Sequence, residues 1–421
     1  MASPGDAAPD SRGPAGLRSA LRSPSFAVLF LGYAVSAVGS GMSAVAISWL
    51  AIRIAHGHDT GLLVGAAVAA YTLPGVVVGL GLGRLLARFD PRLLVLADAA
   101  LRATCLGGIA VIASIGLLAP GWYVALLGVA SLFGLLGVAG DLATVPELLP
   151  PAQHVAGNSL ITVASFAGII LGPALAGLLI AVTSPAVAIG ADGASYVVLV
   201  LAVVVSRRVR APKPRTGEIQ SVSRALRMLS HQPAVLGITI LCVVFFGLYG
   251  PVEVALPVFV SQTLHAGPGV LGGYWTLFAI GATVGALGAS WTLRFGLWRV
   301  ALVVMAGWGI CLVPFGFVHS VIVGFIALAV GGLVYGPFLP LKTTIIQRHS
   351  PPRSLTAIAA ASGVLTVPAA PIGTALGGPI VAAIGPGSTL LASGLATVAA
   401  ASVGAAALVV HRSRKGAKLS A

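Results

Sequence analysis

Charged side chains are scarce in this 421-residue sequence. Asp, Glu, Lys and Arg make up 8% of the residues, hydrophobic residues make up 57%, and the mean hydropathy is +1.03. Acidic residues are the scarcest, because ten of them stand against 24 Lys and Arg. A water-soluble globule of this length needs far more polar surface, so the composition excludes that class of protein.

Cysteine is nearly absent as well. The three cysteines, Cys105, Cys242 and Cys311, all lie inside apolar runs. An odd number of thiols without a pairing pattern argues against a disulfide framework.

Motifs for metals, cofactors and nucleotides are missing too. All eight histidines lie in polar segments or at the ends of apolar runs, so no His pair is available inside a membrane for haem or a metal ion. His56, His58 and Asp59 form one short cluster, which we interpret as a polar turn rather than a metal site. No GxxxxGK[ST] phosphate loop occurs, which excludes nucleotide hydrolysis by that route. We therefore predict no catalytic residue, no cofactor and no metal.

Long apolar runs are the main feature that is present. Each is long enough to cross a bilayer, and because backbone groups in lipid must pair within the chain, runs of this length predict helices rather than strands. The sequence thus predicts an all-α integral membrane protein with twelve transmembrane helices. The approximate spans are 26–54, 61–86, 93–117, 121–146, 155–182, 185–206, 234–261, 269–293, 298–318, 320–346, 355–384 and 388–410.

Basic residues follow the gaps between these runs. Twenty-one of the 24 Lys and Arg fall in every second gap between the apolar runs or in the two terminal segments. Arg53 is the one that flanks one of the intervening gaps. Loops rich in Lys and Arg stay in the cytoplasm, so we expect both termini there and a multi-pass protein of the cell's inner (plasma) membrane. The net charge of +14 is dispersed over loops without a basic module, which indicates contact with lipid headgroups rather than with nucleic acid.

The long polar segment 207–233 divides the spans six and six. We predict a cytoplasmic N-terminal arm at 1–25, a six-helix bundle at 26–206, a cytoplasmic loop at 207–233, a second six-helix bundle at 234–410 and a cytoplasmic tail at 411–421. Arg-Phe occurs only at 88–89 and 294–295, 206 residues apart, and Pro-Pro only at 150–151 and 351–352. Such repeated halves are typical of a transporter whose substrate site lies between them, and we expect a monomer.

The layout resembles the major facilitator superfamily over roughly residues 22–410. The loop 83–92 (GRLLARFDPR) is similar to that superfamily's signature GxLADRxGRR, and 168–177 (GIILGPALAG) is similar to its GxxxGPxxGG antiporter element. Segments 30–33 (FLGY) and 97–102 (ADAALR) resemble the drug:proton antiporter branch that includes macrolide and enterobactin exporters. The resemblance implies two six-helix bundles and proton-coupled efflux.

The sequence departs from the family pattern at two places that bear on proton coupling. Ala87 stands where the signature loop has an acid, and Gly39-Ser40 stands where branch members often carry one. The resemblance therefore assigns no proton-coupling residue at either place. Arg88, Asp90 and Arg92 remain candidates for a gate loop that pairs with helix ends, with orientation of the loop by its charge as the alternative.

Two kinds of residue inside the spans are further candidates. Gly168, Gly172, Pro173 and Gly177 in the antiporter-like element present a thin helix face, which serves either helix packing or the movement of the bundles against each other. Ionisable groups in lipid cost roughly 2.5–3.5 kcal/mol each, so they normally face a cavity or a partner. The ionisable candidates for the substrate or proton pathway are Asp98, Arg102, Asp141, Asp192, Glu253 and Lys342.

These six differ in what we expect of them. Asp98 and Arg102 are four residues apart and able to pair on one helix face. A gate contact is expected of Asp141. Lys342 either reaches the membrane surface or is a cationic partner for Asp141 or for an acidic group of the substrate. Asp192 and Glu253 suit a carboxyl group that exchanges a proton for a cationic substrate, although a hydrogen bond from Ser195 would explain Asp192 equally well.

The sequence thus predicts a secondary active transporter that works by alternating access and expels hydrophobic or amphipathic small molecules, of drug or siderophore type, with protons as the coupling ion. The alternative is an importer or uniporter of a small metabolite. A membrane enzyme is disfavoured because the carboxylates are scattered over several spans without a histidine, and a receptor is disfavoured as well.

Overall fold

A computed structural model describes residues 14–55, 59–86, 89–135, 137, 145–206, 222–351 and 353–419, in which no β-strand occurs. The helices of the first half are α1 (Pro14–Leu21), α2 (Pro24–Ile54), α3 (Thr60–Leu86), α4 (Pro91–Ser114), α5 (Pro120–Ser131), η2 (Pro151–Gln153), α7 (His154–Val182) and α8 (Pro185–Val205).

After α9 (Val222–Ser230) the second half follows. Its elements are α10 (Pro233–Val258), η3 (Phe259–Thr263), α11 (Pro268–Leu287), α12 (Ala289–Thr292), η4 (Leu293–Phe295), α13 (Leu297–Leu312), η5 (Val313–Gly316), α14 (Val321–Tyr335), α15 (Phe338–His349), α16 (Leu355–Thr366), α17 (Ala369–Ile384) and α18 (Pro386–Leu419).

Eleven helical segments within the described residues are long and apolar enough to cross a membrane, which confirms the all-helical membrane fold. Each lies on a predicted span, and its first and last residues differ from the predicted ones by at most six positions. The largest difference is at the end of the segment Pro268–Leu287, which was predicted to end at residue 293. The predicted span 121–146 contains α5, but Leu136 and residues 138–144 lie outside the described residues. Twelve crossings therefore remain a prediction.

Proline marks where many of these helices begin. Pro24, Pro91, Pro185, Pro233 and Pro268 each occupy the first helical position. The missing N–H of proline costs nothing there, because the first N–H groups of a helix have no partner within the helix, and its fixed φ suits the first turn.

Proline also interrupts the long spans of the second half. The segment Val321–His349 is divided into α14 and α15 at Pro337, and the segment Leu355–Ile384 is divided into α16 and α17 at Pro368. Pro257 lies at the end of α10, and the backbone continues as the π-helical turn η3. A proline inside a helix removes a hydrogen bond and clashes with the preceding turn, so each is a point where the helix bends.

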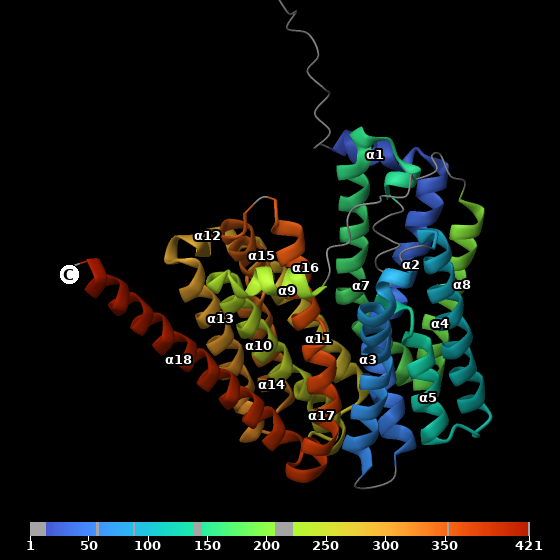
Figure 1. Cartoon of the computed structure of the whole chain (residues 1–421). Coiled ribbons are helices and arrows are strands. Elements are labelled where there is room, and N and C mark those ends of the chain that lie inside the picture. The colour runs from blue at the N-terminus through green and yellow to red at the C-terminus, as the bar shows by residue number, and fades with distance from the viewer. Residues whose placement is uncertain are drawn as a thin grey trace, which may run out of the picture.

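The two halves stand side by side, with α2 to α8 in one and α10 to α18 in the other (Figure 1). We call the end that carries α1, α9, α12 and the turn between α15 and α16 the basic end, and the opposite one the far end. The described arginines at the basic end are Arg18, Arg22, Arg92, Arg224, Arg227, Arg294, Arg299, Arg348 and Arg353. Arg53 lies at the far end, in the last turn of α2.

Two short helices lie in segments that the sequence analysis treats as an arm and a loop. Residues 14–21 of the arm form α1, in which Ala20 is buried, and α9 occupies 222–230 of the central loop, with Ala225 and Leu229 buried. Arg224 and Arg227 are exposed on α9, so this helix has one apolar and one basic face. The rest of both segments, residues 1–13 and 207–221, lies outside the described residues.

Glycines join the helices within each half. In the first half α2 and α7 approach at Gly41 and Gly172, where an added Cβ on Gly172 would lie 2.5 Å from the Gly41 Cα. In the second half α10 and α17 approach in the same way, and a Cβ on Gly377 would lie 2.9 Å from the Pro251 Cα. Without a side chain in between, backbones come into direct contact, which is how membrane helices pack tightly.

The two halves touch each other in the part of the molecule toward the far end (Figure 1). Among the described residues, α3 meets α17 at Gly65, where an added Cβ would lie 2.7 Å from the Gly378 Cα. On the other side α7 meets α11 at Gly177, where an added Cβ would lie 2.9 Å from the Gly269 Cα. Closure at this end therefore depends on two seams in which glycines bring backbones into direct contact.

Candidate functional site: a cavity between the two halves

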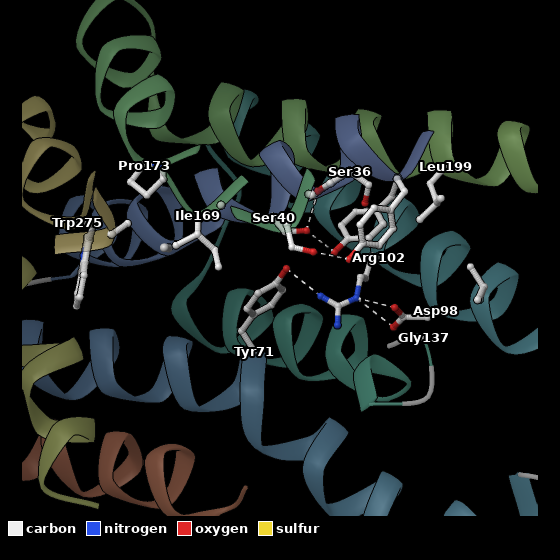
Figure 2. A pocket seen from close by; sticks show the side chains of 18 of the residues that line it. Ser36, Ser40, Tyr71, Asp98, Arg102, Gly137, Ile169, Pro173, Leu199 and Trp275 are labelled. Carbon is white, nitrogen blue, oxygen red and sulfur yellow. Dashed lines mark hydrogen bonds and ion pairs between the residues drawn. The ribbon is translucent and has the colours of Figure 1, made fainter. Parts of the chain in front are cut away.

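A cavity of about 510 Å³ lies between the halves. The first half contributes residues of α2, α3, α4, α7 and α8, and the second half contributes Tyr249 of α10 and Trp275, Phe278 and Ala279 of α11. Figure 2 shows Tyr71, Arg102 and Asp98 on one side of this cavity and Trp275 on the other. The first half thus supplies polar and charged groups, whereas the second half supplies aromatic rings.

Arg102 is the centre of the polar wall. Its Nε donates to both carboxylate oxygens of Asp98, at 3.0 and 3.2 Å, and one terminal nitrogen donates to the Tyr71 hydroxyl at 3.0 Å (Figure 2). The guanidinium also lies 5.3 Å from the ring centroid of Tyr71 and 5.4 Å from that of Tyr196. The pair predicted from the four-residue spacing is therefore present, and it leaves the cavity wall close to neutral.

Two glycines make room for this pair. A Cβ on Gly134 would lie 2.5 Å from an Arg102 terminal nitrogen, and one on Gly137 would overlap the Asp98 carboxylate. Both residues lie just beyond the end of α5, where the chain leaves regular helix at Leu132 and Phe133. At these two positions the chain therefore covers the ion pair with backbone alone, which holds the two charged side chains in one position.

Serines continue the polar wall along α2. The Ser40 hydroxyl lies 2.8 Å from the Tyr196 hydroxyl and donates to the Ser36 carbonyl at 2.8 Å. Near the basic end, the Tyr33 hydroxyl lies 3.0 Å from the Ser165 hydroxyl of α7. Hydroxyl groups at these positions can donate to or accept from a bound molecule without adding charge.

A second cavity of about 280 Å³ adjoins the first toward the far end. The two share Ser40, Ala44, Tyr71, Tyr249 and Trp275, so the second is a deeper continuation of the first. Its distinguishing residue is Glu253, which comes from α10 between two prolines.

The hydrogen bond that the structure describes at the Glu253 carboxylate comes from one neighbouring helix. The Thr374 hydroxyl of α17 donates to its Oε2 at 2.8 Å. Tyr71, Tyr249 and Trp275 line the same deep cavity as the carboxylate. A carboxylate and aromatic rings that line one cavity are the groups that bind organic cations, because ring faces attract positive charge as well.

Aromatic packing extends behind the second-half wall. Tyr249 and Phe278, which line the cavity, lie 5.8 and 5.2 Å from the buried ring of Trp308, measured between centroids. Phe278 also lies 5.5 Å from Tyr335, the last residue of α14 before the break at Pro337. The wall is therefore continuous with the core of the second half and with one of its helix breaks.

Asp192 does not line either cavity. It is 0% exposed and faces α2 from α8, where it accepts a hydrogen bond from the Ser43 hydroxyl. Ser195 donates to its side chain at 3.3 Å and to its carbonyl at 2.7 Å, and an added Cβ on Gly39 would lie 2.7 Å from its Oδ1. The hydrogen bond from Ser195 that the sequence suggested is present, and the structure separates Asp192 from Glu253.

Lys342 also lies away from the two cavities. It is half-buried in α15, and its Nζ donates to the Thr366 hydroxyl of α16 at 3.0 Å. Its predicted partner, Asp141, lies outside the described residues, so the expectation that the two pair stays a prediction.

The predicted gate loop is described in part. Arg88 lies outside the described residues, and so do His56 and His58 of the polar cluster. Asp90 caps α4, since its side chain accepts a hydrogen bond from the Arg92 backbone N–H at 2.9 Å. The Arg92 guanidinium donates to the carbonyls of Val203 and Ser206 at the end of α8. A cation at a helix C-terminus complements the helix dipole, so Arg92 ties α4 to α8 within one half.

The antiporter-like element of α7 contacts two helices, one in each half. Gly168 and Gly172 face α2, where an added Cβ would meet Ala37 or Gly41 of the same half. Pro173 and Gly177 face α11 of the other half, where the Pro173 carbonyl meets Gly272. One turn further toward the basic end, the Thr276 hydroxyl of α11 donates to the Ile170 carbonyl at 3.0 Å. The element therefore joins packing within a half to contact between halves.

Several residues of the site carry no signal in the sequence. Ser43 reaches Asp192 across 149 positions, and Thr374 reaches Glu253 across 121 positions. Gly134 and Gly137 are two among 55 glycines, and nothing in their local pattern marks them as the cover of an ion pair.

A cavity enclosed by two helical halves of a membrane protein is where transporters place their substrate site. Residues 29–366 match the family described as Major Facilitator Superfamily. The chain therefore belongs to the Major Facilitator Superfamily, whose members are transporters and not enzymes.

Sequence relatives include exporters. The chain is 28% identical to the multidrug efflux pump Tap of Mycolicibacterium fortuitum over 391 residues, which cover 89% of this chain and 93% of that protein. It is 27% identical to the enterobactin exporter EntS of Citrobacter koseri over 385 residues, which cover 89% of each.

Solved structures agree in fold. The nucleoside transporter NupG superposes with a TM-score of 0.71 at 13% identity, and the match covers 91% of this chain and 98% of that one. A bacterial homologue of the human lysosomal transporter Spinster, in an inward-facing and unoccupied conformation, gives a TM-score of 0.68 at 12% identity over 94% and 96% of the two chains.

Proposed function

We propose that this protein exports amphipathic small molecules that carry a cationic group, in exchange for protons, by alternating access across the inner (plasma) membrane. The observation that carries the proposal is the position of Glu253, in the deepest part of a cavity that both halves enclose. The similarity to Tap and EntS supports export as the direction, because both are named as efflux proteins.

The lining supports an amphipathic substrate. Aromatic rings of Tyr249, Trp275 and Phe278 offer an apolar surface, while the hydroxyls of Ser36 and Ser40 offer hydrogen bonds on the other wall. Arg102 is paired with Asp98, so it presents little net charge to a ligand. Glu253 then decides which charge the ligand carries, because a negative group in a site of low dielectric favours a cation over an anion.

Glu253 also suits the exchange with a proton. A carboxyl group in a closed cavity is costly to keep charged without a counter-ion, so either a proton or the cationic group of a substrate must occupy it. Binding of one then displaces the other, which couples their opposite movements.

The placement of the contacts supports alternating access. With the basic end in the cytoplasm, as the positive-inside rule requires, the seams at Gly65 and Gly177 close the outer side and the cavity belongs to the cytoplasmic side. Release to the outside then requires both seams to open while the halves approach at the basic end. Because glycines bring the backbones into direct contact at these points, the seams can part as rigid surfaces.

Transport by the purified protein in liposomes tests the proposal. With an imposed pH gradient, a fluorescent amphipathic cation such as ethidium should move against its gradient, and Glu253→Gln should abolish the dependence on pH. The matched control is Glu147→Gln, which removes a buried carboxylate that lines neither cavity. Asp192→Asn should keep the pH dependence, since Asp192 is fully buried and lines neither cavity.

Equal pH dependence in the parent and in Glu253→Gln would refute the exchange at Glu253. Pumping of a neutral or anionic amphiphile in preference to ethidium would refute the substrate class. Facilitated uptake of one polar solute without pumping would favour the importer or uniporter alternative.

A further inference from the structure

A cavity larger than either of those between the halves lies elsewhere on the molecule. It is a groove of about 910 Å³ on the second half, formed by α10, α13 and α18 with one residue of α15. Its lining is apolar apart from His349 and includes Trp298 and Leu302 of α13. We call it the α18 groove. Its members on α10 and α18 are Pro233, Ala234, Gly237, Ile240, Leu241, Val244, Ala400, Val403, Gly404, Ala407 and Leu408.

The course of α18 opens this groove. The helix runs obliquely, and its later part diverges from the rest of the second half toward the basic end (Figure 1). Ala400 to Leu408 lie in this later part, while Pro233 and Trp298 lie in the first turns of α10 and α13, so the groove is at the basic end. Val403 of α18 and Ile240 of α10 are 70% and 54% exposed, so the groove faces outward, into the leaflet at that end.

The first half has a crevice at the position that corresponds to the α18 groove, and side chains of the protein fill it. The repeat of 206 residues relates Arg92 to Trp298, and the Pro-Pro repeat relates Leu148 to His349. The corresponding crevice is lined by Leu29, Arg92, Glu147, Leu148, Val203 and Ser206. Its volume is about 10 Å³, against about 910 Å³ in the second half. Arg92 binds the end of α8 and closes this crevice, whereas Trp298 has no charge with which to hold the end of α18.

The crevice of the first half and the α18 groove also differ in the charged residues around them. Glu147 lines the crevice of the first half, whereas the Pro-Pro repeat places Arg348 and His349 at the corresponding position of the second half. Arg299, next to Trp298, and Arg348, next to His349, are exposed. From residue 234 onward the sequence has nine Lys and Arg but a single acid, Glu253, which lies in the deep cavity. The basic end of the second half therefore has no acidic side chain of its own half to balance it.

We propose that the α18 groove is a binding site for an anionic phospholipid, with an acyl chain in the groove and the headgroup at His349, Arg299 and Arg348. Apolar walls that face a leaflet suit an acyl chain, because an empty apolar space loses contacts on every side. Basic residues at the membrane surface between helices bind anionic headgroups. The lipid fills in the second half the space that Arg92 and α8 fill in the first, and it holds α18 against α10 and α13.

Native mass spectrometry of the full-length protein with added phosphatidylglycerol or phosphatidylcholine tests this site. The parent should retain one phosphatidylglycerol in preference to phosphatidylcholine. Ala407→Trp places a large side chain in the groove and should abolish this retention. Ala406→Trp is the matched control, because it makes the same change at the next residue of α18, which does not line the groove. Arg299→Gln should weaken binding by about fivefold.

A second measurement locates the lipid. In a parent whose other five tryptophans are replaced by phenylalanine, phosphatidylglycerol with brominated acyl chains should quench the fluorescence of Trp298, and the quenching should disappear when Ala407→Phe fills the groove. Equal retention in Ala407→Trp and Ala406→Trp would overturn the proposal, and so would equal affinity for phosphatidylcholine. Displacement of the bound lipid by ethidium at transported concentrations would also overturn it, since the groove would then be a substrate site.

Discussion

The seam between α3 and α17 offers the sharpest test of movement between the halves. Gly65→Ala adds one methyl group, which would lie 2.7 Å from the Cα and 2.8 Å from the backbone nitrogen of Gly378. Both neighbours are backbone atoms and cannot rotate away, so α3 and α17 must separate. The substitution therefore penalises the conformation that is closed at the far end and leaves the opposite conformation unaffected.

The size of the effect follows from the clash. Overpacking of this kind costs about 1–3 kcal/mol. Because the cost falls on one conformation only, it shifts the ratio of far-end-open to far-end-closed molecules by about 5- to 150-fold. Gly272→Ala acts in the same direction from the other seam, since its methyl group would overlap the Pro173 carbonyl.

Chemical labelling measures this ratio. In a parent without its three native cysteines, a cysteine at Thr72, which lines the deep cavity, reports access for a membrane-impermeant maleimide. Gly65→Ala should raise the labelling rate from the far-end side by a factor in the range just given. Gly83→Ala on the same helix is the control, because nothing lies within 4 Å of its added methyl group. Equal rates in Gly65→Ala and Gly83→Ala would refute the reasoning.

Three further substitutions test the contacts of the site. Asp98→Asn leaves the Arg102 charge without its counter-ion and should destabilise the protein by about 3–5 kcal/mol in detergent unfolding, most of which the double variant Asp98→Asn/Arg102→Gln should recover; equal losses in the single and double variants would contradict a buried pair. Thr374→Val should weaken ethidium binding by up to about tenfold in a fluorescence titration, because Glu253 loses the donor that orients it, and unchanged affinity would show that the bond is dispensable. Arg92→Gln should lower unfolding stability by about 1–2 kcal/mol, whereas the exposed Arg353→Gln should not; similar effects would remove the helix-capping role.

The spans could be predicted from the sequence because their signal is local. Each apolar run reports its own length, and prolines such as Pro185 and Pro233 report where helices begin. The pair of Asp98 and Arg102 was predictable for the same reason, since residues four apart share a helix face. The helix α9 also had a local signal, in the alternation of Arg224 and Arg227 with Ala225 and Leu229.

The surroundings of the two carboxylates were not predictable. Asp192 and Glu253 are both acids about two turns from the end of an apolar run, and the sequence treats them alike. The structure distinguishes them, because Asp192 is fully buried against Ser43 and Gly39 of α2, whereas Glu253 lines a cavity that α3 and α11 complete. Which helices meet at each carboxylate depends on packing between distant segments, and a single sequence carries little information on it.

The α18 groove could not be predicted from the sequence for a related reason. The repeat of 206 residues relates Trp298 to Arg92, but only the structure shows that Arg92 holds the end of α8 while the end of α18 diverges. The difference between Arg92 and Trp298 thus accompanies a filled crevice in one half and an open groove in the other.

Proton release on ligand binding tests the exchange at Glu253 most directly. When ethidium is added to the purified protein in weakly buffered detergent solution, the parent should release a proton as the cation binds, and the amount should scale with occupancy. Glu253→Gln should release none at any occupancy that it reaches, while Glu147→Gln should behave as the parent does. Undiminished release from Glu253→Gln would contradict the account, because another group would then be exchanging the proton.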